Sequence, residues 1–570
     1  MMAGALRASG RRKGNWRLSM PLLLVLSLLI VVPAGFVLLA AFSAEVPRPG
    51  NDQLRLTLRN LAVLGEPAIL RAALNSLRIG VLSTALALAI GGFLAFVTAR
   101  TDIPARRFIY LVGLIPMFLP SYVGALAWSM LGSPAAGLLN VAARDLGLPL
   151  AFNMYSVTGV VMVLGLYYAP YAFLLVYASM SMMNPDLEDA ATVHGASPWR
   201  TLFSTTFPLS LPAIVGAALL VFVLAFENFP VAQALATPGR VDTLPTFIYR
   251  MMNNYRGNEA AALAVLLVAI VVLLTWAQHR MLARRSFTTV SGKGVKAKVI
   301  QLGTMRWVAF GVAMAYFLAT VILPLGALFL TTIRTSPYMS SFAALARPNA
   351  IDVVTPFRRI LGSEQFIAAM GNSIFVSVLA ALVGTILAFA VGYAVYRTAA
   401  RGRSLLEAVS MVPLAIPAIV LGMGLLWTWL VMPIPLYGTL WVLVVAFLAA
   451  QMPQGLRAIA ASIRATDKDL EDSAVLAGAH RARAIVYVTV PLMRTAIVSS
   501  FLLLLILSMR ELTVPLFLYT RDTEILSILI FDKFENAGAL QEAAALSLIY
   551  CAVMLALSYL PLRFGRALNH

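Results

Sequence analysis

Cysteine and charged residues are both scarce in this chain. The one cysteine, Cys551, occurs in 570 residues, which excludes an intramolecular disulfide framework. Charged residues make up 12% of the sequence and hydrophobic residues 61%. A soluble fold cannot bury so much apolar surface. The composition therefore predicts a membrane protein whose outer surface is solvated by lipid.

Residues that bind metals or nucleotides are few and dispersed. The four histidines have no ligand partner at the spacing of a metal site. The segment SGKG at 291–294 lacks both the leading glycine and the preceding strand of a phosphate-binding loop. No nucleophile–base pair can be assembled, so a membrane-embedded enzyme is disfavoured. We expect no catalytic residue, no metal site and no cofactor bound by this chain.

Long apolar runs dominate what is present. A membrane-spanning helix needs about 20 predominantly apolar residues, and twelve segments of suitable length predict an all-α polytopic protein. These segments are 20–42, 76–98, 108–131, 154–178, 208–228, 260–278, 307–332, 373–396, 406–430, 439–460, 491–510 and 543–562.

The distribution of basic residues predicts the orientation of these spans. The N-terminal segment MMAGALRASGRRKGNWR carries five basic residues and no acid. If successive loops alternate between the two sides of the membrane, Lys and Arg are enriched in the loops on the same side as this N-terminal segment. Lys and Arg accumulate on the cytoplasmic side, so both termini are predicted to be cytoplasmic. The net charge of +19 then reflects cytoplasmic loops beside membrane lipid and not nucleic acid. A cleaved signal peptide over 1–44 is the alternative, but its apolar stretch is longer than such peptides use.

The chain also contains an internal duplication. LGEPAILRAALNS at 64–76 matches LGSEQFIAAMGNS at 361–373 at an offset of 297. Beyond residue 147 the offset becomes 283, as EAAAL at 259–263 and 542–546 shows, so the first half carries an insertion around 132–147. The repeat predicts two parallel six-helix halves related by an axis along the membrane normal.

These matches predict three regions. The first half covers 1–278, a basic cytoplasmic linker covers 279–305, and the second half covers 306–570. Two proline pairs occupy equivalent places in the halves, and we expect them to break the third and ninth spans, although simple kinks are the alternative. These prolines are Pro116, Pro120, Pro413 and Pro417.

A short polar motif occurs once in each half, in the loop between the fourth and fifth spans. DAATVHG at 189–195 and DSAVLAG at 472–478 are each followed, thirteen residues after the glycine, by a proline. Acids at the start favour a helix N-terminus, small residues allow close approach of another protein, and glycine favours a left-handed helix end. One such loop would be an ordinary amphipathic turn, but two copies at identical spacing predict docking elements over 184–208 and 464–491.

These loops resemble the EAA loop in the membrane subunits of binding-protein-dependent ABC importers, whose pattern is E-A-A, three residues, G, nine residues, I-x-L-P. Aspartate replaces glutamate in both copies, and the other departures, Ser473, Thr205, Val488, Phe207 and Val490, are mild. The matching positions are Asp189, Ala190, Ala191, Gly195, Thr205, Phe207 and Pro208, then Asp472, Ser473, Ala474, Gly478, Val488, Val490 and Pro491.

The resemblance implies a type I permease fold and a complex in which ATP binding, transport and delivery of the cargo belong to different subunits. Each loop would form a coupling helix seated in one of two copies of a cytoplasmic ABC ATPase, where ATP and Mg²⁺ would bind. ATP binding would switch the cavity between the halves by alternating access. A periplasmic substrate-binding protein would deliver the cargo, which places the chain in a bacterial inner membrane.

The cargo is less constrained by the sequence. The stretch MRELTVPLFLYTRDTEILSILIF at 509–531 is most similar to the ferric-iron group of these permeases. Thiamine and aminoethylphosphonate importers of the same two-half design are the alternatives. Ionisable residues within spans suggest function, and Glu227, Arg510 and Glu511 lie at nearly equivalent places at the ends of the fifth and eleventh spans. They would line the permeation path; the alternative is that they mark the membrane boundary.

A twelve-span secondary transporter is the other class considered. ARTDIPARR at 99–107 and YRTAARGRS at 396–404 weakly resemble the loop pattern of major-facilitator carriers. They lack its leading glycine, and buried mid-membrane carboxylates typical of proton-coupled carriers are absent. The repeated loop motif also has no role in that class, so the importer interpretation is favoured.

Overall fold

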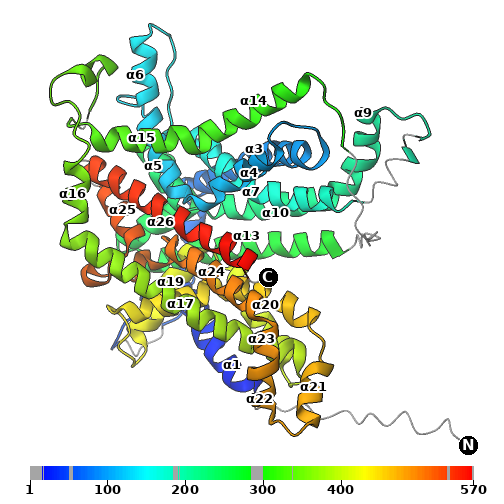
Figure 1. Ribbon diagram of the computed structural model, residues 1–570. Helices are drawn as coiled ribbons and strands as arrows, with labels where there is room; N and C mark the ends of the chain where they lie inside the picture. Colours follow the sequence, from blue (N-terminus) through cyan, green and yellow to red (C-terminus); the bar gives the residue numbers. More distant parts are fainter. Residues whose placement is uncertain are drawn as a thin grey trace, which may run out of the picture.

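The computed structural model describes the chain except for residues 1–15, 17, 51–54, 184–189, 192, 284–298, 337, 536–538 and 568–570. The described residues form helices joined by loops and three isolated β-bridges (Figure 1). Among them, nine helices are long and apolar enough to cross a membrane, or up to twelve if three bent helix pairs each count as one span. The predicted all-α architecture of about twelve spans is confirmed.

The two halves repeat the same order of helices. The first half contains α1 Ser19–Leu26, η1 Ser27–Val31, α2 Val32–Ala41, η2 Arg59–Gly65, α3 Pro67–Arg100, α4 Arg106–Phe118, α5 Ser121–Gly132, α6 Leu138–Asp145, α7 Val157–Ser181, α9 Pro198–Thr201, η3 Leu202–Thr206, α10 Phe207–Phe226, α11 Pro230–Leu235, η4 Thr237–Gly239, α12 Leu244–Asn253 and α13 Gly257–Ala283. The second half contains α14 Met305–Phe317, η5 Leu318–Ile322, α15 Leu323–Ile333, η6 Phe342–Ala346, α16 Thr355–Leu361, α17 Glu364–Arg397, α18 Arg403–Met411, η7 Val412–Ala415, α19 Ala418–Val431, α20 Leu440–Ala465, α21 Asp469–Leu476, α22 Arg481–Ala484, η8 Ile485–Thr489, α23 Val490–Leu492, α24 Arg494–Met509, η9 Val514–Phe517, η10 Arg521–Thr523, α25 Leu526–Glu535 and α26 Leu540–Ala567.

The proline pairs break the third and ninth spans, as the sequence predicts. The chain turns by 93° between α4 and α5 and by 112° between η7 and α19. In both places the residue before the second proline is extended, Leu119 before Pro120 and Ile416 before Pro417. Proline disfavours the helical conformation of its predecessor, which ends each helix there.

The eleventh span, predicted over 491–510, corresponds to α24, and the chain bends at the start of this helix. The chain bends by 76° between α23 and α24, whereas the equivalent fifth span, Leu202–Phe226, is continuous. Both copies contain the motif proline, Pro208 in α10 and Pro491 in α23. The bend at Met493 therefore does not follow from that proline alone.

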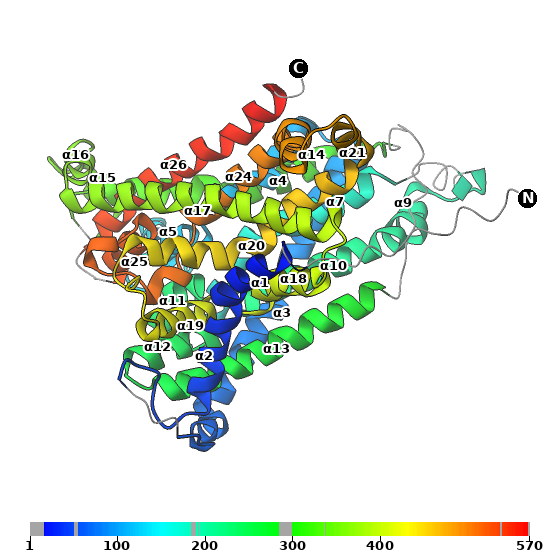
Figure 2. The same cartoon turned by 90° about the horizontal axis from the view of Figure 1, so that it is seen from below.

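The first span of each half packs on the other half. The first span, α1–α2, contacts α18 and α19 as well as α13, and Figure 2 shows α2 lying across these helices. Its counterpart in the second half, α14–α15, contacts α4 and α5. Gly424 permits the first crossing, because a Cβ there would lie 2.5 Å from the carbonyl oxygen of Pro33.

The end of the linker is bound to the first half. The backbone N–H of Ile300 donates to the carbonyl of Arg100 over 2.8 Å, and that of Leu302 donates to Oδ1 of Asp102 over 2.8 Å. The start of the predicted linker is a continuation of α13 to Ala283. Residues 284–298 lie outside the described part of the chain.

The predicted insertion in the first half forms α6, which projects from the bundle in Figure 1. The amide nitrogen of Asn140 donates to the carbonyls of Ser133 and Phe152 over 2.9 and 2.8 Å, fixing the helix to its flanking loops. Oδ2 of Asp145 accepts the backbone N–H of Phe342 over 2.6 Å. The insertion therefore also contacts the second half.

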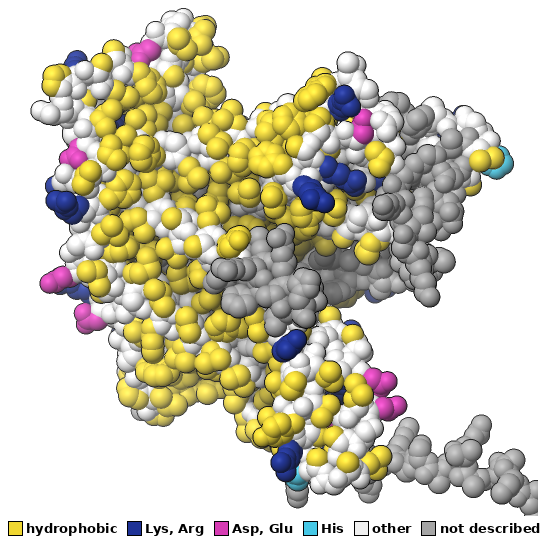
Figure 3. Space-filling view, viewed as in Figure 1, with side chains coloured by type: hydrophobic (Ala, Val, Ile, Leu, Met, Phe, Trp, Pro, Cys, Tyr) yellow, Lys and Arg dark blue, Asp and Glu magenta, His cyan; other side chains and the backbone are white. Residues whose placement is uncertain are grey.

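Hydrophobic side chains cover the face seen in Figure 3, over α15, α17 and α26, while charged side chains gather toward its ends. On α17, Ile386 is 61% exposed although its neighbours pack inside. An apolar face bounded by charged ends suits a bilayer, whose hydrocarbon core excludes charge.

Candidate coupling loops and permeation path

The two motif loops lie at the same end of the bundle on separate arms, with α9 on one and α21 and α22 on the other (Figure 1). We call this the motif end. The motif glycines adopt left-handed backbone conformations, with φ of +82° at Gly195 and +94° at Gly478. Each glycine therefore ends the preceding helical segment in a conformation that other residues rarely adopt.

Equivalent motif residues have matching environments in the two loops. Ala190 and Ser473 are exposed, and Ala191 and Ala474 are half-buried. The later motif positions lie on the helical segments that lead into the fifth and eleventh spans: Thr205, Phe207, Pro208, Val488, Val490 and Pro491. Asp189 lies outside the described residues, and its counterpart Asp472 is on α21.

The second motif loop is fixed to the bundle by an acid that sequence reasoning did not single out. Glu471, one position before Asp472, is 3% exposed. Its carboxylate accepts hydrogen bonds from the hydroxyls of Tyr393 on α17 and, over 2.9 Å, Thr489 on η8. Nε of Arg481 lies 3.5 Å from the same carboxylate. Of the two adjacent acids at the start of α21, Glu471 is therefore buried and Asp472 is partly exposed.

Two pairs of exposed apolar side chains accompany the motif, and these too were missed. Val193 is 85% exposed and Leu476 88%, and they are equivalent at the 283-residue offset. Phe203 and Val486, also equivalent, are 68% and 56% exposed. Exposed apolar groups that recur at one place in both repeats indicate a contact surface for another protein. The signal available in the sequence was an apolar residue two positions before each motif glycine.

The three polar residues at the ends of the fifth and eleventh spans lie inside the molecule. Glu227 and Arg510 are the residues that end α10 and α24, and both are half-buried. Glu227 lies within electrostatic range of Glu511. Nη1 of Arg510 donates to the carbonyl of Met117, in the broken third span of the other half, over 2.9 Å.

The chain beyond these residues folds back into the bundle instead of leaving it. Val231 and Leu235 on α11 are fully buried, as is Val514 on η9. Buried helical segments therefore follow both Glu227 and Arg510, and the path and boundary interpretations of these residues both stay predictions.

The internal repeat relates these polar residues in pairs of different chemistry. Glu227 corresponds to Arg510, because each is the first residue after its span. Glu511 corresponds to Asn228, and the side chains make equivalent bonds. Oδ1 of Asn228 accepts the N–H of Val231 over 2.9 Å, and Oε1 of Glu511 accepts that of Val514 over 3.2 Å. The repeat thus places opposite charges, not like charges, at matched positions.

Aromatic side chains join the halves at the end opposite the motif end. Tyr122 lies 5.9 Å from Phe531, and Phe229 lies 6.3 Å from the same ring, measured between ring centroids. Tyr249 and Phe517 form a further contact between the halves at 5.9 Å. Phe229 and Phe531 are almost fully buried. The halves are therefore closed against each other here, while their motif loops stand on separate arms.

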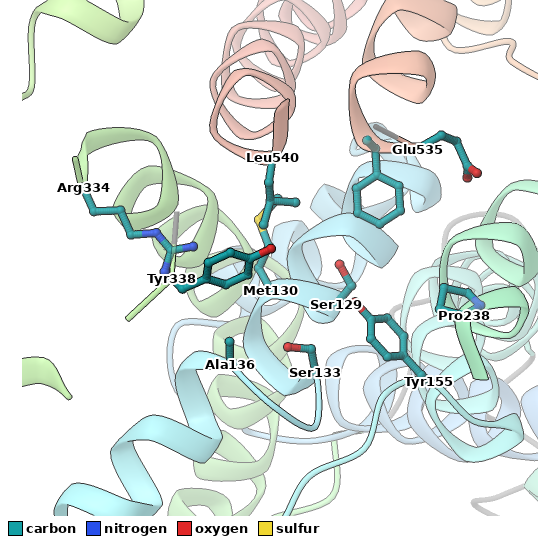
Figure 4. A pocket seen from close by; sticks show the side chains of 11 residues that line it. Ser129, Met130, Ser133, Ala136, Tyr155, Pro238, Arg334, Tyr338, Glu535 and Leu540 are labelled. Carbon is teal, nitrogen blue, oxygen red and sulfur yellow. The ribbon is translucent and has the colours of Figure 1, made fainter. Parts of the chain in front are cut away.

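Polar cavities flank this aromatic contact. One of about 280 Å³ lies between the halves, with Ser129 and Tyr155 from the first half and Arg334, Tyr338 and Glu535 from the second (Figure 4). Another of about 410 Å³ is lined by Tyr249 and Asp532, among others. Within the described residues, no group of three or more His, Cys, Asp or Glu side chains could hold a metal ion.

A duplicated bundle of spans with broken helices, an interior polar group and two matched docking loops defines a membrane permease. The family described as the inner membrane component of binding-protein-dependent transport systems matches residues 87–287 and 380–569. The chain belongs to this family, and is a multi-pass inner membrane permease of the ABC importer class with a type I fold. The membership supports the importer interpretation over the secondary-transporter alternative.

The relatives include ferric transport permeases. The ferric transport system permease protein FbpB of Actinobacillus pleuropneumoniae is 23% identical over 506 residues, 87% of this chain and 71% of that protein. The Fe(3+)-transport system permease protein FbpB 2 of Haemophilus influenzae is 22% identical over 85% of this chain and 88% of its own.

Among solved structures, a bacterial alginate ABC transporter in complex with a pentasaccharide-bound periplasmic protein has a chain that matches 48% of this one. The match covers 95% of that chain, with 20% identity and a TM-score of 0.40. The region boundaries at 278 and 305 and the roles of individual motif residues stay predictions.

Proposed function

We propose that this chain is the complete membrane pathway of an ATP-driven importer of ferric iron. Two copies of a cytoplasmic ATPase subunit would dock at the motif loops 184–208 and 464–491, and ATP and Mg²⁺ would bind to them. A periplasmic binding protein would deliver the ion at the opposite end. Alternating access between the halves would then carry it across the membrane.

The matched pair of motif loops is the observation that supports ATP-driven import. Each presents a left-handed glycine and an almost fully exposed apolar side chain, Val193 or Leu476, at the same place. Two equivalent surfaces on one chain suit two copies of one partner. The separation of the arms at the motif end, with aromatic contacts closing the other end, fits one of the two states that alternating access requires.

The cargo assignment rests on the named relatives and on the chemistry of the interior. Both ferric permeases quoted above align with most of this chain. Glu227 and Glu511 place two carboxyl groups at the interface of the halves, beside the guanidinium of Arg510. A cation can cross such a site if it binds weakly, since tight coordination would prevent release.

The orientation follows from the same assignment. The motif end faces the cytoplasm, where ATP is available, so both termini are cytoplasmic. The basic residues near the N-terminus are consistent with this orientation.

The first experiment is co-purification of the detergent-solubilised chain with ATPase subunits from the host that encodes it. We expect two ATPase subunits per chain for the wild type and none for a Gly195→Trp, Gly478→Trp double variant. Trp must adopt a left-handed conformation at both sites and projects from the docking surface. A Gly216→Trp, Gly371→Trp variant is the control, because both glycines are helical with open space around them.

Cargo is then measured as ATP-dependent uptake of radioactive ferric iron into proteoliposomes that hold the complex, with the binding protein added outside. Normal ATPase binding and uptake by the motif double variant would contradict the coupling role. ATPase binding without iron uptake would keep the importer and reject the cargo, leaving thiamine and aminoethylphosphonate to be tried.

A further inference from the structure

Glu471 connects three elements that otherwise meet only loosely at the motif end. It belongs to α21, the helix of the second motif loop, and its carboxylate is 3% exposed. One oxygen accepts the Tyr393 hydroxyl from α17, and the other accepts the Thr489 hydroxyl from η8 over 2.9 Å. Both α17 and the η8–α24 segment continue into the membrane, so the carboxylate joins the loop to two spanning segments.

Arg481 holds this carboxylate in place. Its Nε lies 3.5 Å from Glu471 and 3.4 Å from the Tyr393 hydroxyl. The neighbouring acid, Asp472, has only distant partners, Lys468 at 3.9 Å and Arg481 at 3.8 Å, and its side chain is 42% exposed. The two adjacent acids therefore differ in what they can do: a buried carboxylate with several donors is a rigid connection, and a solvated one is not.

Two of the partners of Glu471, Tyr393 and Arg481, have no counterpart of the same chemistry in the first half. The residue equivalent to Tyr393 at the 297-residue offset is Phe96, which has no hydroxyl and lines an apolar cavity of about 440 Å³. The residue equivalent to Arg481 at the 283-residue offset is Pro198. The glutamate and the threonine are repeated, as Glu188 and Thr206, and Thr206 is buried like Thr489. Glu188 lies outside the described residues. The tie between motif helix and α17 thus belongs to the second half.

We infer that Glu471 is a positioning residue that transmits movement of the second motif loop to α17 and α24. This inference rests on the proposed function, since it takes the loop to be moved by an ATPase. When the ATPase displaces α21, the hydrogen-bonded carboxylate moves with it, and its partners on the spanning segments follow. Without the Glu471 carboxylate, the second motif loop moves but α17 and α24 do not follow it.

The test compares transport with ATP hydrolysis in the reconstituted complex. Glu471→Gln removes the charge while keeping the shape, and Tyr393→Phe removes one donor and gives the second half the residue type of the first. Glu364→Gln is the control, because it also replaces a glutamate but lies outside the motif loop, at the exposed start of α17. We expect both Glu471→Gln and Tyr393→Phe to bind ATPase normally and hydrolyse ATP, while cargo moved per ATP falls about tenfold. Glu364→Gln should leave this ratio within about twofold of the wild type.

A second pair of variants separates transmission from simple support of the fold. Thr489→Ser keeps the donor to Glu471, and Thr489→Val removes it at similar volume. The ratio of transport to hydrolysis should be retained in the first and reduced in the second. A purely structural role would lower both rates together, with less folded protein on size-exclusion chromatography, and would overturn the inference.

The failure of this inference is distinct from failure of the proposed function. If wild-type protein bound no ATPase, the proposed function would fail. If ATPase bound and drove transport, but Glu471→Gln and Tyr393→Phe kept the wild-type ratio, only the transmission role would fail.

Discussion

Gly91 and Gly92 are neighbours on α3, but a side chain at each would meet different surroundings. A Cβ at Gly91 would lie 2.4 Å from the carbonyl oxygen of Ala169 and 2.7 Å from the backbone nitrogen of Phe173, both on α7. A Cβ at Gly92 would meet nothing within 4 Å. The close approach of α3 and α7, which forms the centre of the first half, therefore depends on one glycine of the two.

We predict that Gly91→Ala destabilises the protein by about 1–3 kcal/mol, because backbone atoms cannot move aside as a side chain can. Gly92→Ala should be neutral or stabilising by up to about 1 kcal/mol, since alanine favours the helix. The measurement is the melting temperature of each variant in detergent. Equal melting temperatures for the two variants would show that the helices are not packed as described.

Charge at the interface of the halves gives a second prediction at this scale. Glu227→Gln and Glu511→Gln keep side-chain shape, and the amide oxygen at 511 can still accept the backbone N–H of Val514. We expect each to lower ferric iron uptake about tenfold, because a cation loses a countercharge on its path. ATPase binding should be unchanged. Glu364→Gln, at the exposed start of α17, is the control, and uptake equal to this control would remove these residues from the path.

Individual residues also show what the sequence could reveal. The left-handed conformations of Gly195 and Gly478 were predictable, because a glycine directly after a short helix commonly ends it in that conformation. The distinction between Glu471 and Asp472 was not, because it depends on Tyr393, which comes from a different span. The 283-residue offset already pairs Glu227 with Arg510, and the observed helix ends agree with that pairing.

Broken helices are the principal feature at the scale of elements. A break removes hydrogen bonds from carbonyls in the preceding turn, and these need other partners inside a membrane. The carbonyl of Met117 is bonded by Arg510 from the other half. The break in the third span thus leaves a backbone acceptor that Arg510 of the second half uses.

We predict that Pro120→Ala impairs transport about tenfold while the chain still inserts. Alanine lets the helix continue past Leu119, and the carbonyl of Met117 then bonds within the helix and not with Arg510. Pro116→Ala is the control, because Pro116 is already accommodated inside α4. Uptake assays on proteoliposomes would show whether the first variant falls below the second, and equal uptake would contradict the role of the break.

Two of the three breaks in the spans could be predicted from the sequence, and the third could not. Proline pairs predicted both breaks at α5 and α19, since the residue before a proline resists helix formation. The bend at Met493 was not predictable, because α10 contains the equivalent motif proline, Pro208, and remains straight.

At the scale of the whole molecule, the halves are bound by an exchange of their first spans. Oγ of Ser19 donates to the carbonyl of Arg401 over 2.5 Å, and α2 packs on α19, where Gly424 meets Pro33. The hydroxyl of Tyr316 on α14 donates to the carbonyl of Leu166 over 3.0 Å. No local sequence pattern encodes this exchange, because each span is apolar on all sides.

We predict that two separately expressed chains, 1–290 and 291–570, assemble without the covalent linker. The exchanged spans bury enough surface to hold them together, so a tag on one should co-purify the other. Gly424→Leu should reduce this co-purification several-fold, because its side chain overlaps the Pro33 carbonyl. Gly311→Leu, with open space around it, is the control. If the separated chains never co-purified, the exchange would be too weak to join the halves.

The exchange also sets an order for biosynthesis. The span α1–α2 leaves the ribosome several hundred residues before α19, its partner in the second half, has been translated. It must therefore wait in the bilayer with the surface that packs on α19 against lipid until most of the chain has been inserted. The span α14–α15 finds α4 and α5 already in place when it emerges. The first helix made can pack on α13 within its own half, but its contact with α19 can form only after much of the second half has been made.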